Sequence, residues 1–163
     1  MVEKETRFRG ICQHSNTGIA ITEPSGRIVE GNRSFAELLG CNEADLPGRF
    51  IARFAACEPT TEETELHNEL MRGDRASYRI EKCLKAGGER LLWADLSVTA
   101  IRCEDGRTGS LVYMAIDISE RKKALEHLEV QQAFLEQRIA ERTQDLSLAK
   151  EAAEAASRAK STF

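Results

Sequence analysis

The sequence predicts an α+β globular domain followed by one long coiled-coil helix. Between residues 18 and 117, runs rich in β-branched and aromatic residues alternate with glycine turns and two segments of helical spacing. After Ile118 neither Gly nor Pro occurs, and apolar residues recur at alternating steps of four and three. Asp117 stands at the border with Glu120 three residues on, which is the spacing of a helix-capping box.

Length and charge limit the classes of partner. A chain of 163 residues with 41% apolar residues is enough for one domain with an extension. The net charge of -4 comes from interspersed acids and bases, so neither nucleic acid nor an acidic membrane surface is an expected partner. The first residues lack the apolar core of a signal peptide, and no run of about 18 uncharged apolar residues occurs. We therefore expect a soluble, cytoplasmic chain without a membrane segment.

The sequence contains no motif of metal binding or independent catalysis. Five cysteines are widely spread without a CxxC pair, and we expect them to be reduced packing residues. Neither HExxH nor paired Cys/His spacing is present, so no metal site is predicted. GxSxG and GxxxxGK[ST] are also absent, and an enzymatic activity of this chain alone is not expected.

The first third of the chain predicts an arm, a hairpin and a short helix. Residues 1–10 are polar and are expected to form an N-terminal arm or a short helix. Residues 18–22 and 27–30 are predicted strands around the Pro24-Ser25-Gly26 turn. Apolar residues share one face of a predicted helix over 34–40, which Gly40 should end. Asn32 precedes it, and a helix-cap or turn role is favoured there over a role in ligand binding.

The remainder of the domain predicts a helix and three strands. Residues 41–62 carry Pro47-Gly48 and Pro59 and are expected to form loops and helical turns. A helix over 62–72 should end at Gly73, and strands are predicted over 77–85, 91–102 and 110–117. Side chains alternate between the faces of a strand. In the strand over 91–102, one face should therefore carry Ala94, Leu96, Val98 and Ala100, and the other Trp93, Asp95, Ser97, Thr99 and Ile101. In the strand over 110–117, Leu111, Tyr113 and Ala115 should oppose Val112, Met114 and Ile116.

Both predicted faces are apolar, so both should be covered. The domain's own helices can cover one face. The other face needs the N-terminal arm or a second subunit.

The C-terminal segment, residues 118–163, carries a heptad seam. Seven heptad steps run from Ile118 to Phe163, and the helix should be on the order of 65–70 Å long, too long for one small domain to cover. We therefore predict a parallel homodimer. Its seam includes Leu125, Leu128, Gln132, Leu135, Ile139, Arg142 and Leu146. Gln132 and Arg142 are polar positions of this seam. They either fix the register of the two helices or weaken the seam, and in the second case a small structural change at the start of the helix selects between two helix packings of similar free energy.

Several of these segments together resemble the PAS domain, a sensory module of signalling proteins. The resemblance covers roughly Ile11 to Lys122. It rests on the opening hairpin, Asn32-Arg33-Ser34-Phe35 with Leu39-Gly40, the Gly88-to-Ile101 strand, the Glu104-Asp105-Gly106 turn and Asp117-Ile118-Ser119-Glu120-Arg121-Lys122. That last run is similar to the Asp-Ile-Thr motif that ends PAS domains, with Ser in place of Thr. The resemblance implies an antiparallel sheet of about five strands, with helices on one face, over residues 11–117.

The tail is similar to the linker that leads into sensor histidine kinases. The similarity lies in Arg138-Ile139-Ala140-Glu141-Arg142-Thr143 and in the last eight residues, and the chain ends before the phosphoacceptor histidine of that family. This similarity implies that the chain is the input part of a two-component sensor histidine kinase of the simple or the hybrid type. The kinase domain and the response regulator would then be its downstream partners. Asp117, Ile118, Glu120 and Arg121 would relay the signal to the helix.

The resemblance also implies where a ligand or cofactor would bind. The concave face would present Ala94, Leu96, Val98, Tyr113 and Ala115 to a small molecule, or would be filled by the core. Covalent flavin photochemistry is not expected, because Pro47-Gly48-Arg49-Phe50-Ile51 does not match the Asn-Cys-Arg-Phe-Leu run of light-sensing relatives. Non-covalent flavin stays open. Haem would use a histidine at the position of His67, which is otherwise a packing or surface residue.

Three hypotheses for the function follow. In the first, a ligand, redox event or partner alters the sheet, and the coiled coil relays the change to a kinase. In the second, the domain is a ligand-free dimerisation scaffold. In the third, the output is a different enzyme, such as a cyclic-nucleotide cyclase.

Overall fold

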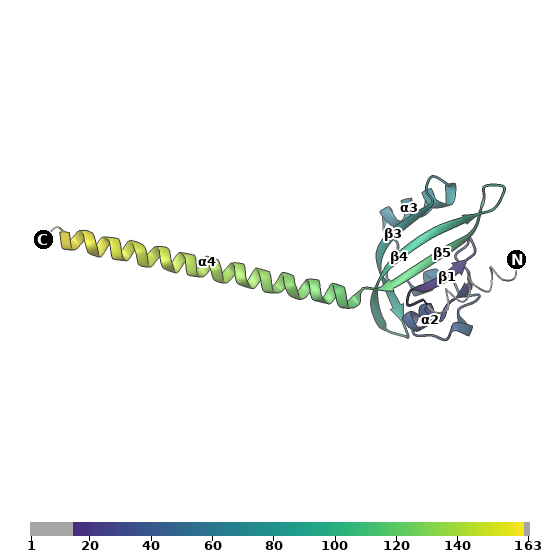
Figure 1. The fold of residues 1–163 in the computed structure, drawn as a ribbon, viewed down its shortest axis with the longest axis horizontal. Helices are drawn as coiled ribbons and strands as arrows, with labels where there is room; N and C mark the ends of the chain where they lie inside the picture. Colours follow the sequence, from purple (N-terminus) through teal and green to yellow (C-terminus); the bar gives the residue numbers. More distant parts are fainter. Residues whose placement is uncertain (1–14, 162–163) are drawn as a thin grey trace. The chain divides into compact units, whose positions relative to one another are not determined.

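A computed structural model describes residues 15–161 as a five-stranded antiparallel sheet with helices on one face, followed by one long helix (Figure 1). The chain divides into a globular unit that ends at Glu120 and a helical unit that begins at Arg121. The predicted fold class is thereby confirmed. The arm predicted over residues 1–10 lies outside the described residues.

The five strands form one sheet in the order β2-β1-β5-β4-β3. Their bounds are β1 (Gly18–Thr22), β2 (Ile28–Gly31), β3 (Ser77–Ala86), β4 (Arg90–Arg102) and β5 (Thr108–Asp117). The last three strands follow one another as antiparallel neighbours, and β1 pairs with β5. The largest difference from the predicted bounds is at β5, which begins at Thr108 rather than at Ser110.

Both short helices are ended by the residues that the sequence suggests. In α2 (Arg33–Leu39), the Asn32 side chain accepts the N–H of Phe35, and Gly40 closes the helix at φ 65°. In α3 (Thr61–Arg72), the cap is Thr60, and Gly73 ends the helix at φ 96°. Positive φ favours glycine, because it has no Cβ to clash. The predicted cap role of Asn32 is confirmed, whereas Thr60 as a cap was not predicted.

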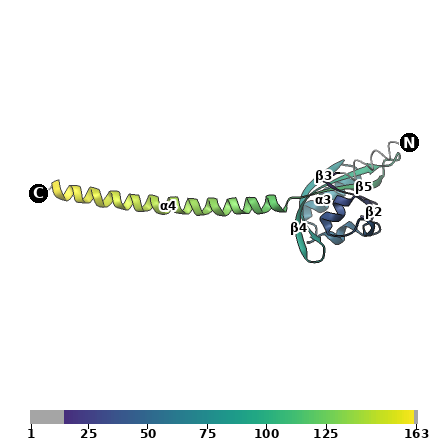
Figure 2. The ribbon, with the colours of Figure 1, turned by 60° about the horizontal axis from the view of Figure 1, so that its bottom comes forward.

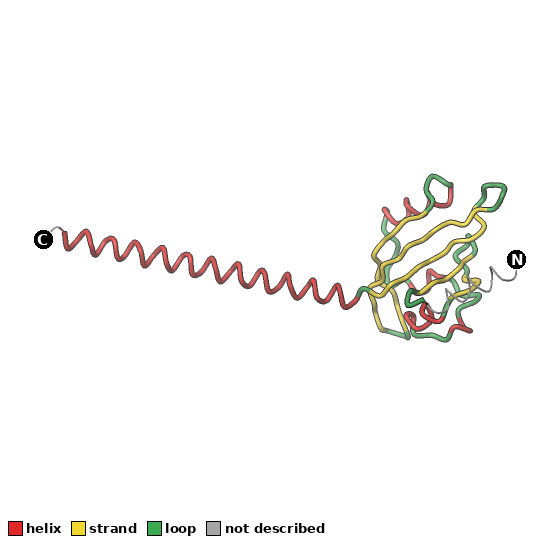
Figure 3. The backbone as a smooth tube through the Cα atoms, in the orientation of Figure 1, coloured by secondary structure: helices red, strands yellow, loops and turns green. Residues whose placement is uncertain are grey.

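Two short 3-10 helices lie in the segment between α2 and α3. They are η1 (Glu43–Asp45) and η2 (Ile51–Phe54), and Figure 3 traces them as helical turns between loops. Isolated bridges join Phe50 to Arg27 and Ala55 to Leu84. These bridges hold the segment against the hairpin and β3. The two 3-10 helices agree with the predicted loops and helical turns, whereas periodicity cannot reveal the long-range pairing.

The strand register produces the two faces that the alternation predicts. Tyr78, Val98 and Tyr113 are successive neighbours across β3, β4 and β5, and Ala20 of β1 completes the row. This face packs on buried residues of α2 and α3, including Phe35 and Leu70. Figure 2 shows the helices and the sheet from a second direction.

The opposite face of the sheet carries exposed apolar side chains. Trp93, Ile101, Met114 and Ile116 keep between 40% and 51% of their surface exposed. A cover from the N-terminal arm or from a second subunit stays a prediction.

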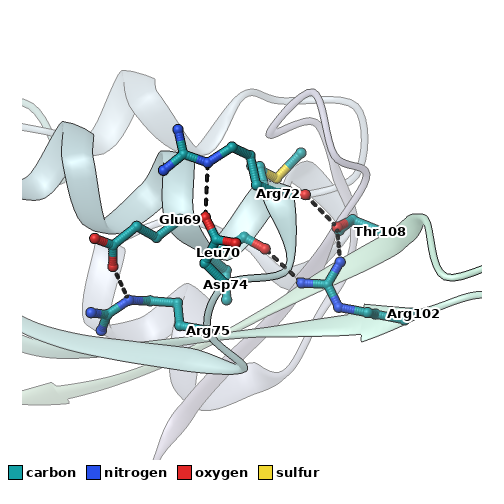
Figure 4. A network of polar contacts seen from close by, with 8 residues as sticks. Glu69, Leu70, Arg72, Asp74, Arg75, Arg102 and Thr108 are labelled. Carbon is teal, nitrogen blue, oxygen red and sulfur yellow. Dashed lines mark hydrogen bonds and ion pairs between the residues drawn. The ribbon is translucent and has the colours of Figure 1, made fainter.

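Polar contacts fix the C-terminal end of α3 to the sheet (Figure 4). The Arg102 guanidinium donates to the carbonyl of Leu70 at 2.6 Å and to the Thr108 hydroxyl at 3.0 Å. That hydroxyl in turn donates to the carbonyl of Met71 at 3.4 Å. The ion pairs Arg75–Glu69 and Arg72–Asp74 lie beside them. The last carbonyls of a helix have no partner within the helix, and β4 and β5 supply one here.

The long helix α4 (Ser119–Ser161) begins one residue later than predicted. A carboxylate oxygen of Asp117 accepts the N–H of Ser119 at 2.8 Å at the start of the helix. Ile118 is only 7% exposed. It is therefore buried in the globular unit and does not start the helical seam, which corrects the heptad count.

The apolar residues of α4 are exposed. Leu125, Leu128, Leu135, Ile139 and Leu146 keep between 48% and 71% of their surface exposed in the single chain. Among residues 15–161, no helix combines the length and the apolar character needed to cross a bilayer.

Candidate ligand-binding cavity

A cavity of about 740 Å³ is lined by the inner face of the sheet, by α3 and by residues 50–59. The strands contribute Tyr78, Ile80, Lys82, Leu84, Lys85, Leu96, Val98 and Tyr113, and α3 contributes Glu63, Thr64 and His67. Residues two apart on a strand point to the same face, which is why β3 supplies every second residue from 78 to 84. Pockets of a few hundred Å³ with apolar walls and few polar groups are typical small-molecule sites.

Three of the five predicted concave-face residues line this cavity. They are Leu96, Val98 and Tyr113. Ala94 and Ala115 are fully buried and are not among the lining residues. Ala94 lies opposite Lys82 on β3, and its methyl group is too short to extend past its longer neighbours.

His67, predicted as the residue for haem, also lines the cavity. The contribution of β3 was missed. The alternation of residues 78, 80, 82 and 84, together with antiparallel pairing to β4, is the signal that indicates it.

The cavity wall contains an ion pair between α3 and β3. The Lys82 ammonium and the Glu63 carboxylate are 2.5 Å apart, and their side chains are only 13% and 18% exposed. A partly buried charge is costly unless an opposite charge compensates it. Each of the two residues therefore neutralises the other, and the pair links the first turns of the helix to the sheet.

His67 contacts Tyr78 across the same gap. The distance from Nδ1 to the Tyr78 hydroxyl is 3.3 Å, and the two rings meet edge to face. Burial lowers the pKa of His67, although the nearby Glu63 acts in the opposite direction. The imidazole is therefore neutral at pH 7. Its Nδ1 is occupied by this contact, so haem ligation, which stays a prediction, would need Nε2.

Tyr113 presents a protonated hydroxyl to the cavity. Burial, with a smaller contribution from Glu63, raises its pKa to about 12. Burial also raises the pKa of Tyr78, assisted by Tyr113 and Glu63. Within residues 15–161 the Tyr113 hydroxyl has no hydrogen-bond partner, although the side chain is only 8% exposed.

Alkaline titration should show that both tyrosines stay protonated in the folded chain. Tyr78 and Tyr113 are the only tyrosines of the sequence. The folded-state pKa of Tyr113 lies above the unfolded value of about 10. Folding therefore favours the protonated form, and its contribution to stability is lost as the pH rises from about 10 to about 12.

We expect tyrosinate absorbance to remain absent from the native chain at about pH 10.5, where the urea-unfolded control already shows more than half of it. Coincident titration curves for the native and unfolded chains would contradict the burial of both hydroxyls.

The strand β4 also holds the start of α4. The regular ladder between β4 and β5 ends at Ala94 opposite Asp117. Beyond it, the Ile118 N–H donates to the Trp93 carbonyl at 2.8 Å, and the Trp93 N–H donates to the Ser119 hydroxyl at 3.0 Å. The Ser119 side chain thus stands in for a backbone acceptor and continues the pairing into the first residue of the helix.

The predicted relay residues are placed unequally around this junction. Asp117 and Ile118 belong to it, Glu120 is exposed just after it, and Arg121 begins the helical unit. Trp93 and Ser119 were missed as junction residues. Their contact depends on the register between β4 and β5.

Comparisons with known proteins agree with this architecture. The sequence model of the family described as the PAS fold matches residues 12–123. The chain is 26% identical over 121 residues to the probable diguanylate cyclase DgcE of Escherichia coli, and 23% identical over 128 residues to the sensor histidine kinase TmoS of Ectopseudomonas mendocina. These alignments cover 74% and 78% of this chain, but only 11% and 13% of the two relatives.

A solved structure shares the fold. The PAS domain of a protein from Colwellia psychrerythraea superposes with a TM-score of 0.61 at 13% identity. The match covers 72% of this chain and 98% of that one.

Proposed function

Because this chain belongs to the PAS-fold family and is similar to parts of a sensor histidine kinase and of a probable diguanylate cyclase, we propose that it binds a small molecule in the cavity and relays this event to α4. The observation that carries the proposal is the double role of β4. Leu96 and Val98 in the middle of this strand line the cavity, and Trp93, nearer its N-terminal end, pairs with Ile118 and Ser119.

The relay needs only a small displacement of the strand. The two cavity residues lie three and five positions along β4 from Trp93, and both sides of the strand are held in a ladder. A hydrogen-bonded strand moves as a unit, so a ligand that shifts Leu96 or Val98 also shifts the groups that hold the first residue of the helix.

The proposed relay also requires a second copy of the chain, whose long helix packs against α4. The seam of α4 is exposed among the described residues 15–161, and a parallel coiled coil would bury it. Gln132 and Arg142 weaken the seam, so two packings of similar free energy become accessible. The signal then passes as rotation or repacking of the two helices, and the sheet's outer face is a further dimer contact.

The downstream domain is proposed from the relatives. TmoS favours a histidine kinase with a response regulator as its partner, and DgcE favours a diguanylate cyclase as the second candidate. A ligand-free scaffold is the alternative for the domain itself, and haem and flavin are the alternative cofactors. An absorption spectrum of the purified chain separates those two cofactors from an organic ligand, because both absorb at longer wavelengths than Trp93 and the tyrosines.

The Ser119→Ala variant tests the junction. It removes the acceptor of the Trp93 N–H. We expect amide hydrogen exchange at Trp93 and in the first turn of α4 to accelerate by about tenfold, which corresponds to the loss of one hydrogen bond. Exchange at the centre of β5 should not change. Ser147→Ala, at an exposed position within α4, is the matched control and should leave the junction unaffected.

Equal exchange rates in Ser119→Ala and in the wild-type chain would mean that the helix start is not held by β4. The proposed relay would then fail, whatever the cavity binds.

A further inference from the structure

Among the buried and partly buried polar side chains of the cavity wall, within residues 15–161, the hydroxyl of Tyr113 is the exception. Glu63 is paired with Lys82, and His67 contacts Tyr78. The hydroxyl of Thr64 donates to the backbone carbonyl of the cap residue Thr60. Tyr113 lines the same cavity at 8% exposure, yet its hydroxyl has no partner within residues 15–161.

An unpartnered hydroxyl at such a position points to a ligand. Among the described residues only the Thr22 side chain has a fully buried polar atom without a partner, so the Tyr113 oxygen is accessible from the cavity and can donate a hydrogen bond to a bound molecule. Tyr113 lines the cavity together with the apolar residues Ile80, Leu96 and Val98, so the same cavity offers apolar contact surface. An oxygen acceptor on a bound molecule would complete the hydrogen bonding of the site.

The charges of the cavity select against ions. The partly buried wall of the cavity contains the Glu63–Lys82 ion pair, in which the two opposite charges compensate each other. A bound carboxylate would compete with Glu63 for the ammonium, and a bound amine would compete with Lys82 for the carboxylate. Either event leaves one partly buried charge without a counter-charge. The remaining charged lining residues, Glu58 and Lys85, are exposed to solvent.

We propose that the cavity is specific for an uncharged organic molecule with an apolar body and one oxygen acceptor, a ketone, ether or alcohol, which the Tyr113 hydroxyl binds. This inference rests on the proposed function and adds the chemical class of its ligand. Ile80, Leu96 and Val98 pack against the apolar body, and the Glu63–Lys82 pair excludes organic acids and amines.

Three probes that share a phenyl body test the ligand class. Acetophenone carries the acceptor, ethylbenzene lacks it, and benzoate is the anion. Their affinities for the full chain are measured by calorimetric titration or by ligand-observed NMR at pH 7. We expect acetophenone to bind and benzoate to bind at least tenfold more weakly.

The Tyr113→Phe variant tests the hydroxyl itself. Removing an unpartnered hydroxyl should leave the fold intact. We expect the ratio of acetophenone affinity to ethylbenzene affinity to fall by about five- to tenfold. This is the loss of affinity that removal of one hydrogen bond between uncharged groups produces. A ratio within one variant is insensitive to general loosening of the cavity. Thr99→Val, which removes an exposed hydroxyl of the neighbouring strand β4, is the matched control and should leave the ratio unchanged.

The Glu63→Gln variant tests the role of the ion pair. It leaves the Lys82 ammonium without its carboxylate, and we expect benzoate to gain at least tenfold in affinity. Glu65→Gln, one position outside the lining and exposed on the same helix, is the control.

Each contrary result has its own meaning. Wild-type binding of benzoate at least as strong as that of acetophenone would overturn the uncharged class and leave the proposed function standing. An unchanged ratio in Tyr113→Phe would overturn the role of that hydroxyl. Failure of all three probes to bind would overturn both this inference and the ligand-binding half of the proposed function, while the exchange measurement at Ser119 still tests the relay.

Discussion

The Leu135→Glu variant is expected to be monomeric at concentrations at which the wild-type chain is a dimer. Leu135 lies on the heptad seam between Leu128 and Ile139, and it is 58% exposed in the single chain. In a parallel coiled coil two copies of the side chain would be buried against each other. Glutamate would place two carboxylates there, so the dimer dissociation constant should rise at least about 100-fold, which sedimentation equilibrium measures.

The neighbouring residue provides a matched control for the seam. Phe134 is also apolar and is 57% exposed, but it lies off the heptad seam. Phe134→Glu makes the same chemical change one residue away and should leave the dimer intact. An unaltered monomer–dimer balance in Leu135→Glu would contradict a coiled-coil dimer. Dissociation by both variants would place the contact on a different face of α4.

Local signals in the sequence were sufficient for most of the architecture. Gly40 and Gly73 end helices because they adopt positive φ, and turn residues separate β3, β4 and β5 where the sequence suggests. Both kinds of signal act between residues close in the chain. The junction with α4 could not be predicted in the same way. Ile118 fits the heptad count, yet it is buried in the globular unit because it continues the pairing of β5 with Trp93.

The candidate site was only partly accessible from the sequence for a related reason. Period-two alternation correctly places Ala94, Leu96 and Val98 on one face, but it does not tell which of them reaches a cavity. That depends on side-chain length and on where α3 lies over the sheet. Lys82 and Glu63 come from different elements, 19 positions apart, and only the folded register brings them together.

The Asn32→Ala variant is expected to lose about 3 kcal/mol of unfolding free energy. The side chain is 5% exposed and links three segments. Its Oδ1 accepts the N–H of Ile19 at 2.8 Å and that of Phe35 at 2.9 Å, and its Nδ2 donates to the carbonyl of Thr17 at 3.0 Å. Alanine would leave three backbone groups without this partner. Urea unfolding followed by the fluorescence of Trp93, the only tryptophan, measures the loss.

Asn42 offers the matched control, because it precedes η1 but makes no side-chain cap bond and is exposed. Asn42→Ala should change the unfolding free energy by no more than about 0.5 kcal/mol. Asn32→Asp keeps the two acceptor contacts and loses the donor, so its stability should lie between those of the wild-type chain and Asn32→Ala. If Asn32→Ala were as stable as Asn42→Ala, the three hydrogen bonds would not hold β1 to α2, and the amide would be free for another role. A large loss confined to Asn32 means that its polar atoms are committed to the fold, which leaves ligand recognition to Tyr113 and its neighbours.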